Sequence, residues 1–118
     1  MKKVVVCDDD EDIITLVALL LDTIPVEYST IRELNDAVSQ IHAEQPDLIL
    51  MDLKIPVMGG EKAVDLLKND ESTSHIPVLL FSANDDIAYI CKECGADGFI
   101  SKPFEIGNFK AKLVEHLA

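Results

Sequence analysis

The sequence lacks an apolar run long enough to cross a membrane, which needs about 20 consecutive apolar residues. Its basic start, Met1-Lys2-Lys3, is followed by only four apolar residues before Asp8, too few for the apolar stretch of a signal peptide. Cysteine is scarce as well, and three cysteines are an odd number that argues against a disulfide framework. We therefore expect a protein of the reducing cytoplasm with no membrane partner.

Basic residues are also few. The 10 lysines and arginines are outnumbered by 22 aspartates and glutamates, which gives a formal net charge of −12. A field of this sign repels phosphate backbones, so we expect no direct binding of nucleic acid. It favours basic protein surfaces and bound cations as partners.

Linkers and low-complexity tracts are missing too. A chain of 118 residues fits one domain, and it can bury a core without disulfides or a structural metal. We therefore predict a single domain over residues 1–118.

The chain does contain a series of short, unbroken apolar runs. Runs of this length between polar turns are typical of strands that are buried on both faces of a sheet. They cover residues 4–7, 48–51, 78–81 and 99–100, and the segment 26–30 is a weaker candidate.

Segments with helical periodicity separate these runs. The first places five apolar residues on one face, and the later ones repeat the pattern within 34–41, 63–67, 87–94 and 109–117. The five of the first segment are Ile13, Leu16, Val17, Leu20 and Leu21. Strands and helices that alternate in this way predict an α/β fold, a mostly parallel sheet with helices on both faces.

Polar side chains follow the apolar runs where each predicted strand ends. In an open α/β sheet, ligands bind outside the carboxyl ends of the strands, so these side chains should gather at one edge. They are Asp8, Asp9, Asp10, Asp52, Ser82 and Lys102.

The chemistry of these residue types points to phosphoryl transfer. Carboxylates that lie close together repel one another unless a cation lies among them, and oxygen ligands suit Mg²⁺. An aspartate such as Asp52 can form an acyl phosphate, a reaction that needs alignment and neutralised phosphoryl oxygens. Mg²⁺, the ammonium of Lys102 and the hydroxyl of Ser82 can each take one of those oxygens. The residue types therefore predict a site for Mg²⁺-dependent phosphoryl transfer to an aspartate.

Four segments, in this order and spacing, resemble the receiver domain of two-component response regulators. They are VVVCDD at 4–9, LILMDLKIPVMGG at 48–60, VLLFSA at 78–83 and GADGFISKPF at 95–104. The resemblance covers essentially the whole chain. It implies a flavodoxin-like (βα)5 fold, a doubly wound parallel sheet with strand order 2-1-3-4-5.

The resemblance also implies specific roles for the strand-end residues. Asp52 would accept a phosphoryl group from a phosphohistidine on a histidine kinase or a histidine phosphotransfer protein. The side chains of Asp8, Asp9 and Asp52 and the backbone carbonyl of Lys54 would hold Mg²⁺. Lys102 would contact the phosphoryl oxygens, and its peptide bond to Pro103 would be cis.

The implied output is a conformational switch. Ser82 would move towards the phosphoryl group and Phe99 would turn inward behind it, which would remodel the surface of the fourth helix, fifth strand and fifth helix. A downstream protein target would bind that surface, and phosphorylation-dependent homodimers are known in the family. The domain would catalyse only its own phosphorylation and dephosphorylation, so it is not expected to be an enzyme otherwise.

Three positions depart from the family pattern. Gly59 stands where an aspartate usually forms a turn or cap before the next helix. We expect this change to affect the local stability of the segment more than the chemistry of the site. Ser82 replaces the commoner threonine and keeps the hydroxyl. Phe99 replaces a tyrosine of some members, and it can turn but offers no hydroxyl.

Alternatives remain beside a stand-alone receiver. The domain could be excised from a hybrid histidine kinase or a DNA-binding regulator. The Asp8-x-Asp10 pattern imitates the nucleophile motif of haloacid-dehalogenase-type phosphatases, although the closing acids of that pattern are missing. A receiver-like interaction module that needs no phosphate is a third alternative. The CxxC pair Cys91 and Cys94 is expected to pack in the core, because structural zinc needs four ligands.

Overall fold

The computed structural model describes residues 1–117 of the chain, and the last residue of the predicted domain, Ala118, lies outside the described part. Within these residues, five strands alternate with five helices. In chain order they are β1 (Lys2–Cys7), α1 (Glu11–Leu21), β2 (Val26–Ile31), α2 (Ala37–Glu44), β3 (Leu48–Asp52), α3 (Gly60–Lys68), β4 (Val78–Ser82), α4 (Ile87–Cys94), β5 (Gly98–Ser101) and α5 (Ile106–Leu117).

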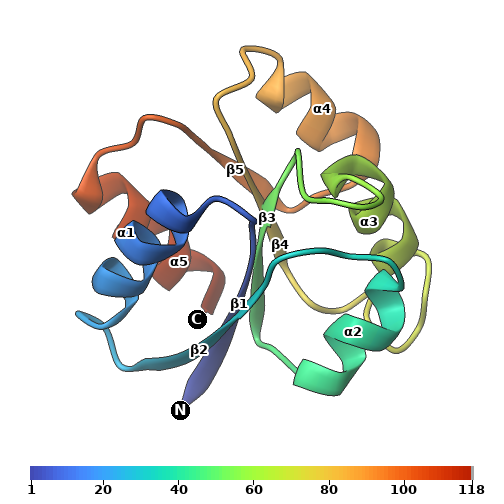
Figure 1. Ribbon diagram of the computed structural model, residues 1–118, viewed down its shortest axis with the longest axis horizontal. Coiled ribbons are helices and arrows are strands. Elements are labelled where there is room, and N and C mark those ends of the chain that lie inside the picture. Colours follow the sequence, from blue (N-terminus) through green and yellow to red (C-terminus); the bar gives the residue numbers. More distant parts are fainter. Residues whose placement is uncertain (118) are drawn as a thin grey trace.

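The five strands form one parallel sheet in the order β2-β1-β3-β4-β5, as predicted. Helices α1 and α5 cover one face of this sheet, and α2, α3 and α4 cover the other (Figure 1). The order turns back beside β1, because the chain adds β2 on one side of β1 and β3 on the other. In sheets of this kind, ligands bind at the carboxyl edge near that reversal.

The sheet separates two apolar cores. Successive strand residues point to opposite faces, so Val4 and Val6 pack under α1 and α5, whereas Val5 and Cys7 pack under α2, α3 and α4. Strands β3 and β4 are buried along their whole length. Burial on both faces explains why these strands are unbroken apolar runs in the sequence.

The buried face of α1 contains Val17, Leu20 and Leu21 as predicted, and it departs from the prediction at two positions. Leu16 is 40% exposed, and Ile14 takes a place in the core instead, together with Val17 and Leu21. The stretch from Ile13 to Leu21 is apolar at most positions, so its periodicity fits more than one face, and packing against the sheet decides between them.

Helix ends are set by local chemistry. Oδ1 of Asp10 accepts the backbone N–H groups of Asp12 at 2.9 Å and Ile13 at 3.4 Å, so Asp10 caps α1. Gly95 ends α4 with a positive φ of 85°, at the C-cap that the sequence predicted. No helix in residues 1–117 has both the length and the apolar character that a membrane crossing requires.

Candidate functional site

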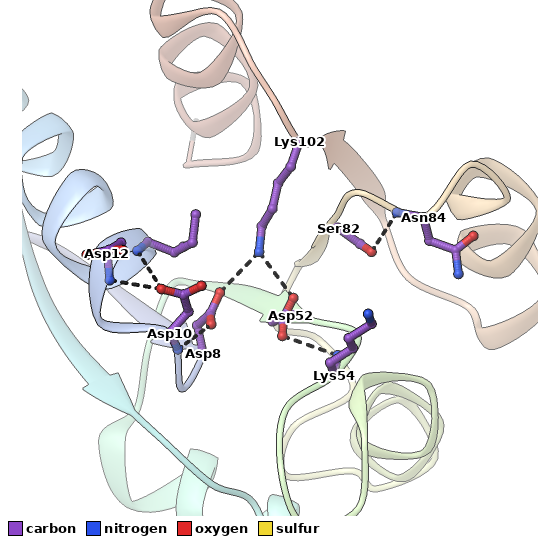
Figure 2. A network of polar contacts seen from close by, with 9 residues as sticks. Asp8, Asp10, Asp12, Asp52, Lys54, Ser82, Asn84 and Lys102 are labelled. Atoms are coloured by element: carbon purple, nitrogen blue, oxygen red, sulfur yellow. Dashed lines mark hydrogen bonds and ion pairs between the residues drawn. The ribbon is translucent and has the colours of Figure 1, made fainter.

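The carboxyl ends of β1, β3, β4 and β5 surround a cleft of about 360 Å³. Its walls carry every strand-end residue that the sequence singled out, brought together from four separate parts of the chain. Figure 2 labels all of them except Asp9. The lining residues are Asp8, Asp9, Asp10, Asp52, Lys54, Ser82, Ala83, Asn84 and Lys102. The predicted switch residue Phe99 lies outside this cleft.

Three of the carboxylates that line the cleft form a cluster. One carboxylate oxygen from each of Asp8, Asp9 and Asp52 lies within 4.8 Å of the others. Asp8 is 1% exposed and Asp52 is 8% exposed, whereas Asp9 faces solvent. Oδ1 of Asp8 accepts the backbone N–H of Asp10 at 2.9 Å, which fixes the turn from β1 into α1. The set offers oxygen ligands only, the kind that suits a hard divalent cation such as Mg²⁺.

Lys102 reaches into this cluster from the loop that follows β5. Its Nζ lies 3.2 Å from Oδ1 of Asp52 and 3.4 Å from Oδ2 of Asp8, and Figure 2 shows the side chain pointing between the two carboxylates. The same Nζ stands 4.5 Å from the centre of the Phe81 ring. The peptide bond between Lys102 and Pro103 is cis, as the resemblance implied.

The surroundings of Asp52 disfavour its charged form. Burial raises the pKa of the Asp52 carboxyl, and the neighbouring charge of Asp8 raises it further. The Lys102 ammonium and the backbone N–H of Lys54, 3.2 Å from Oδ2, oppose this rise without cancelling it. A bound cation would relieve the repulsion, so the three carboxylates fit a metal electrostatically as well as by ligand type.

Ser82 ends β4 at the opposite wall of the cleft from Asp8. Its Oγ accepts the backbone N–H of Asn84 at 3.0 Å, which leaves the hydroxyl proton available to another acceptor (Figure 2). Phe99 is half-buried and packs against the core under α4.

Sequence reasoning missed one member of the site. Phe81 reads as an ordinary residue of a buried apolar run, yet its ring is the surface on which the Lys102 ammonium lies. Only the parallel pairing of β4 with β5, which places Phe81 opposite Ile100, brings the two together. No local pattern carries that signal.

Comparison with known proteins agrees with this geometry. The family model of the response regulator receiver domain matches residues 4–114. The chain belongs to the response regulator receiver domain family. Receiver domains are the signalling domains of two-component systems, so this family accounts for the predicted α/β fold and the acidic cleft.

Two relatives show the settings in which such receivers occur. The chain is 32% identical over 117 residues to the DNA-binding dual master transcriptional regulator RpaA of Synechocystis sp., covering 96% of this chain and 48% of that protein. It is 34% identical over 91 residues to a histidine kinase of Formosa agariphila, covering 74% of this chain and 7% of the kinase. The chain thus spans about half the length of the regulator and a small part of the kinase.

A solved receiver domain shares the fold. The receiver domain of a sensor histidine kinase from Pseudomonas aeruginosa superposes with a TM-score of 0.88 at 20% identity, covering 98% of this chain and 97% of that one. That structure has a magnesium ion coordinated in its active site cleft.

Proposed function

We propose that this receiver is a Mg²⁺-dependent phosphorelay switch whose phosphoacceptor is Asp52. One observation carries the proposal: the carboxylate of Asp52 lies both in the cluster with Asp8 and Asp9 and 3.2 Å from the Lys102 ammonium. A phosphoryl group carries charge on several oxygens, and its transfer is governed by alignment and by neutralisation of that charge. A buried carboxylate that has an ammonium on one side and oxygen ligands for a divalent cation beside it suits that reaction.

The side chains of Asp8, Asp9 and Asp52 and the backbone carbonyl of Lys54 would hold Mg²⁺. Bound there, the ion would neutralise charge on the phosphoryl group and on the carboxylates. The magnesium ion in the Pseudomonas receiver supports this assignment.

In the reaction, an oxygen of Asp52 attacks the phosphorus of a phosphohistidine on a histidine kinase or a histidine phosphotransfer protein. The P–N bond breaks, its electron pair stays on the imidazole, and an acyl phosphate forms on Asp52. The Lys102 ammonium and the Ser82 hydroxyl donate to separate phosphoryl oxygens. Later attack by water on phosphorus returns the carboxylate and releases phosphate.

Phosphorylation of Asp52 changes the surface formed by α4, β5 and α5. When the phosphoryl group draws Ser82 towards Asp52, the loop after β4 moves with it, and Phe99 turns into the space this opens. The equilibrium shifts by no more than the new contacts supply, about 1–3 kcal/mol. A downstream protein target reads the altered surface, and a second phosphorylated copy is another partner of this kind.

We assign residues 1–118 to one phosphoacceptor domain that acts in the cytoplasm, in keeping with its free cysteines. The two relatives are longer proteins, so they support the alternative of a receiver that belongs to a longer kinase or regulator. They do not test the stand-alone alternative. The phosphatase alternative loses support, because its second motif aspartate, Asp10, serves as the cap of α1.

The test is to incubate the protein with acetyl phosphate and Mg²⁺ and to map the modified residue by mass spectrometry after borohydride reduction. We expect Mg²⁺-dependent modification at Asp52, none in Asp52→Asn, and strongly slowed modification in Asp8→Asn. Modification at Asp8 would favour the phosphatase. The phosphate-independent module would be favoured if the partner bound three proteins equally well. These are Asp52→Asn, the unmodified wild type and the phosphorylated wild type.

A further inference from the structure

Phe81 lies beneath the ammonium of Lys102. The 4.5 Å between Nζ and the ring centre is within the roughly 6 Å over which an aromatic face attracts a cation. Phe81 is buried in the core under α1 and α5, so little water screens the attraction. Lys102 therefore has three partners, which are the carboxylates of Asp8 and Asp52 and one neutral ring.

The two charged partners are those that a cation in the cleft would engage. Asp8 and Asp52 belong to the carboxylate cluster, and a divalent ion there would offset most of the negative charge that attracts Lys102. The ion also repels the ammonium directly, since both are positive. The Phe81 ring has no oxygen to offer Mg²⁺, so it stays available to Lys102.

We propose that Phe81 is a positioning residue, which keeps the Lys102 ammonium inside the cleft after a divalent cation has engaged Asp8 and Asp52. The proposal rests on the Mg²⁺ and phosphoryl chemistry assigned above. Its consequence is that Lys102 is already in place when the phosphoryl group arrives and does not have to return from solvent.

The ring is itself firmly held. Its centroid lies 5.3 Å from that of Phe104 and 6.0 Å from that of Phe109, and the last two rings stack at 4.9 Å. Phe109 is as buried as Phe81, packs on the same ring and touches no ammonium in the described part of the chain. Phe109→Leu is therefore a matched control for Phe81→Leu, because both remove one ring from the same cluster.

The test is NMR of the Lys102 side chain, with Lys102→Arg to assign its signals. Protons above an aromatic face are shifted upfield, so we expect upfield Lys102 Hε resonances in the wild type that persist when Mg²⁺ saturates the site. In Phe81→Leu the shift should vanish, whereas Phe109→Leu should keep it. If the wild-type signals moved to the chemical shifts of an ordinary lysine when Mg²⁺ was added, the proposal would be overturned. This outcome needs no comparison with a variant.

A kinetic measurement tests the consequence. We expect Phe81→Leu to slow phosphorylation by acetyl phosphate about five-fold at saturating Mg²⁺, the size of a modest cation–π contact, and Phe109→Leu to leave it near the wild-type rate. Mg²⁺ affinity, measured by calorimetry, should match the wild type in Phe109→Leu and be slightly tighter in Phe81→Leu, because the ammonium can then move away from the ion. Equal slowing in both variants would mean that the ring only supports the core. If the wild-type protein were not phosphorylated at all, the proposed function would be overturned. The NMR shift would still test whether Phe81 holds Lys102 in the cleft.

Discussion

Gly60 lies so close to Asp52 that a Cβ atom at its position would stand 2.6 Å from the carbonyl oxygen of Asp52. The same atom would lie 2.9 Å from Cα of Leu53, and both neighbours are backbone atoms that cannot rotate away. The first residue of α3 therefore packs directly on the chain that carries the proposed phosphoacceptor. A glycine is required there because no other residue lets the helix approach so closely.

Gly60→Ala should consequently push α3 away from the end of β3. We expect a loss of about 1–3 kcal/mol in unfolding free energy, as for other overpacked sites, together with slower phosphorylation. Urea unfolding measures the first quantity. Gly107→Ala is the control, because a Cβ at this position has no atom within 4 Å. Gly107 lies in α5, where alanine should stabilise the fold by about 0.5 kcal/mol. A Gly60→Ala protein as stable as the wild type would contradict the observed packing.

Gly59 adopts a backbone conformation that is essentially reserved for glycine, with φ 83° and ψ 155°. The family usually has an aspartate here, and Gly59 makes no side-chain cap to α3. In Gly59→Asp, a new cap would contribute about 1 kcal/mol, but strain in this region costs about 1–3 kcal/mol. We therefore expect a net loss of stability in thermal melts, and a larger loss in Gly59→Ala, which gains no cap. A stabilised Gly59→Asp variant would mean that the loop can relax to the family conformation.

The strands and the site were predictable because both depend on unbroken apolar runs and on the residue after each run. Asp52 and Ser82 stand where those runs end, and a parallel sheet brings such ends to one edge. The buried face of α1 was not predictable in detail, because Leu16 and Ile14 are equally apolar. Nor was the contact of Phe81 with Lys102, which depends on strand pairing rather than on local sequence.

Cys7 should be inert to thiol reagents in the folded protein. Burial, assisted by the charge of Asp8, raises the pKa of the Cys7 thiol to about 12, from an ordinary value of 9.0. At pH 8 we expect a disulfide reagent to modify the half-buried Cys94 first and Cys7 only on unfolding. Because the unfolded chain releases this proton near pH 9 and the folded one does not, Cys7 should also lower stability above that pH. A Cys7→Ala variant would lack that alkaline loss, and rapid labelling of native Cys7 would contradict its burial.

Asp52 should destabilise the metal-free fold at neutral pH. Its folded pKa is raised by burial and by Asp8, so the folded state binds its proton more tightly than the unfolded chain does. Stability therefore falls as pH rises from the ordinary carboxyl range through the folded pKa, and it is recovered as pH falls again. In EDTA at pH 7 we expect Asp52→Asn to melt at a higher temperature than the wild type. The difference should shrink on acidification, since the wild-type carboxyl then becomes neutral as well.

Mg²⁺ should reverse the order of stability of the wild type and Asp52→Asn. By binding the folded state alone, the ion stabilises the wild type by an amount that grows with the logarithm of its concentration over the dissociation constant. Asp52→Asn has lost a ligand and gains less. Melting curves over a Mg²⁺ series at pH 7 should therefore cross, with the variant more stable without metal and the wild type more stable at saturation. Asp22→Asn is the control, because Asp22 caps the C-terminus of α1 and does not line the cleft. Whatever its melting temperature without metal, Mg²⁺ should raise that temperature as much as it does in the wild type. If Asp52→Asn were less stable than the wild type in EDTA, the Lys102 ion pair would outweigh the burial of Asp52, and the electrostatic reason for a cation at this site would be lost.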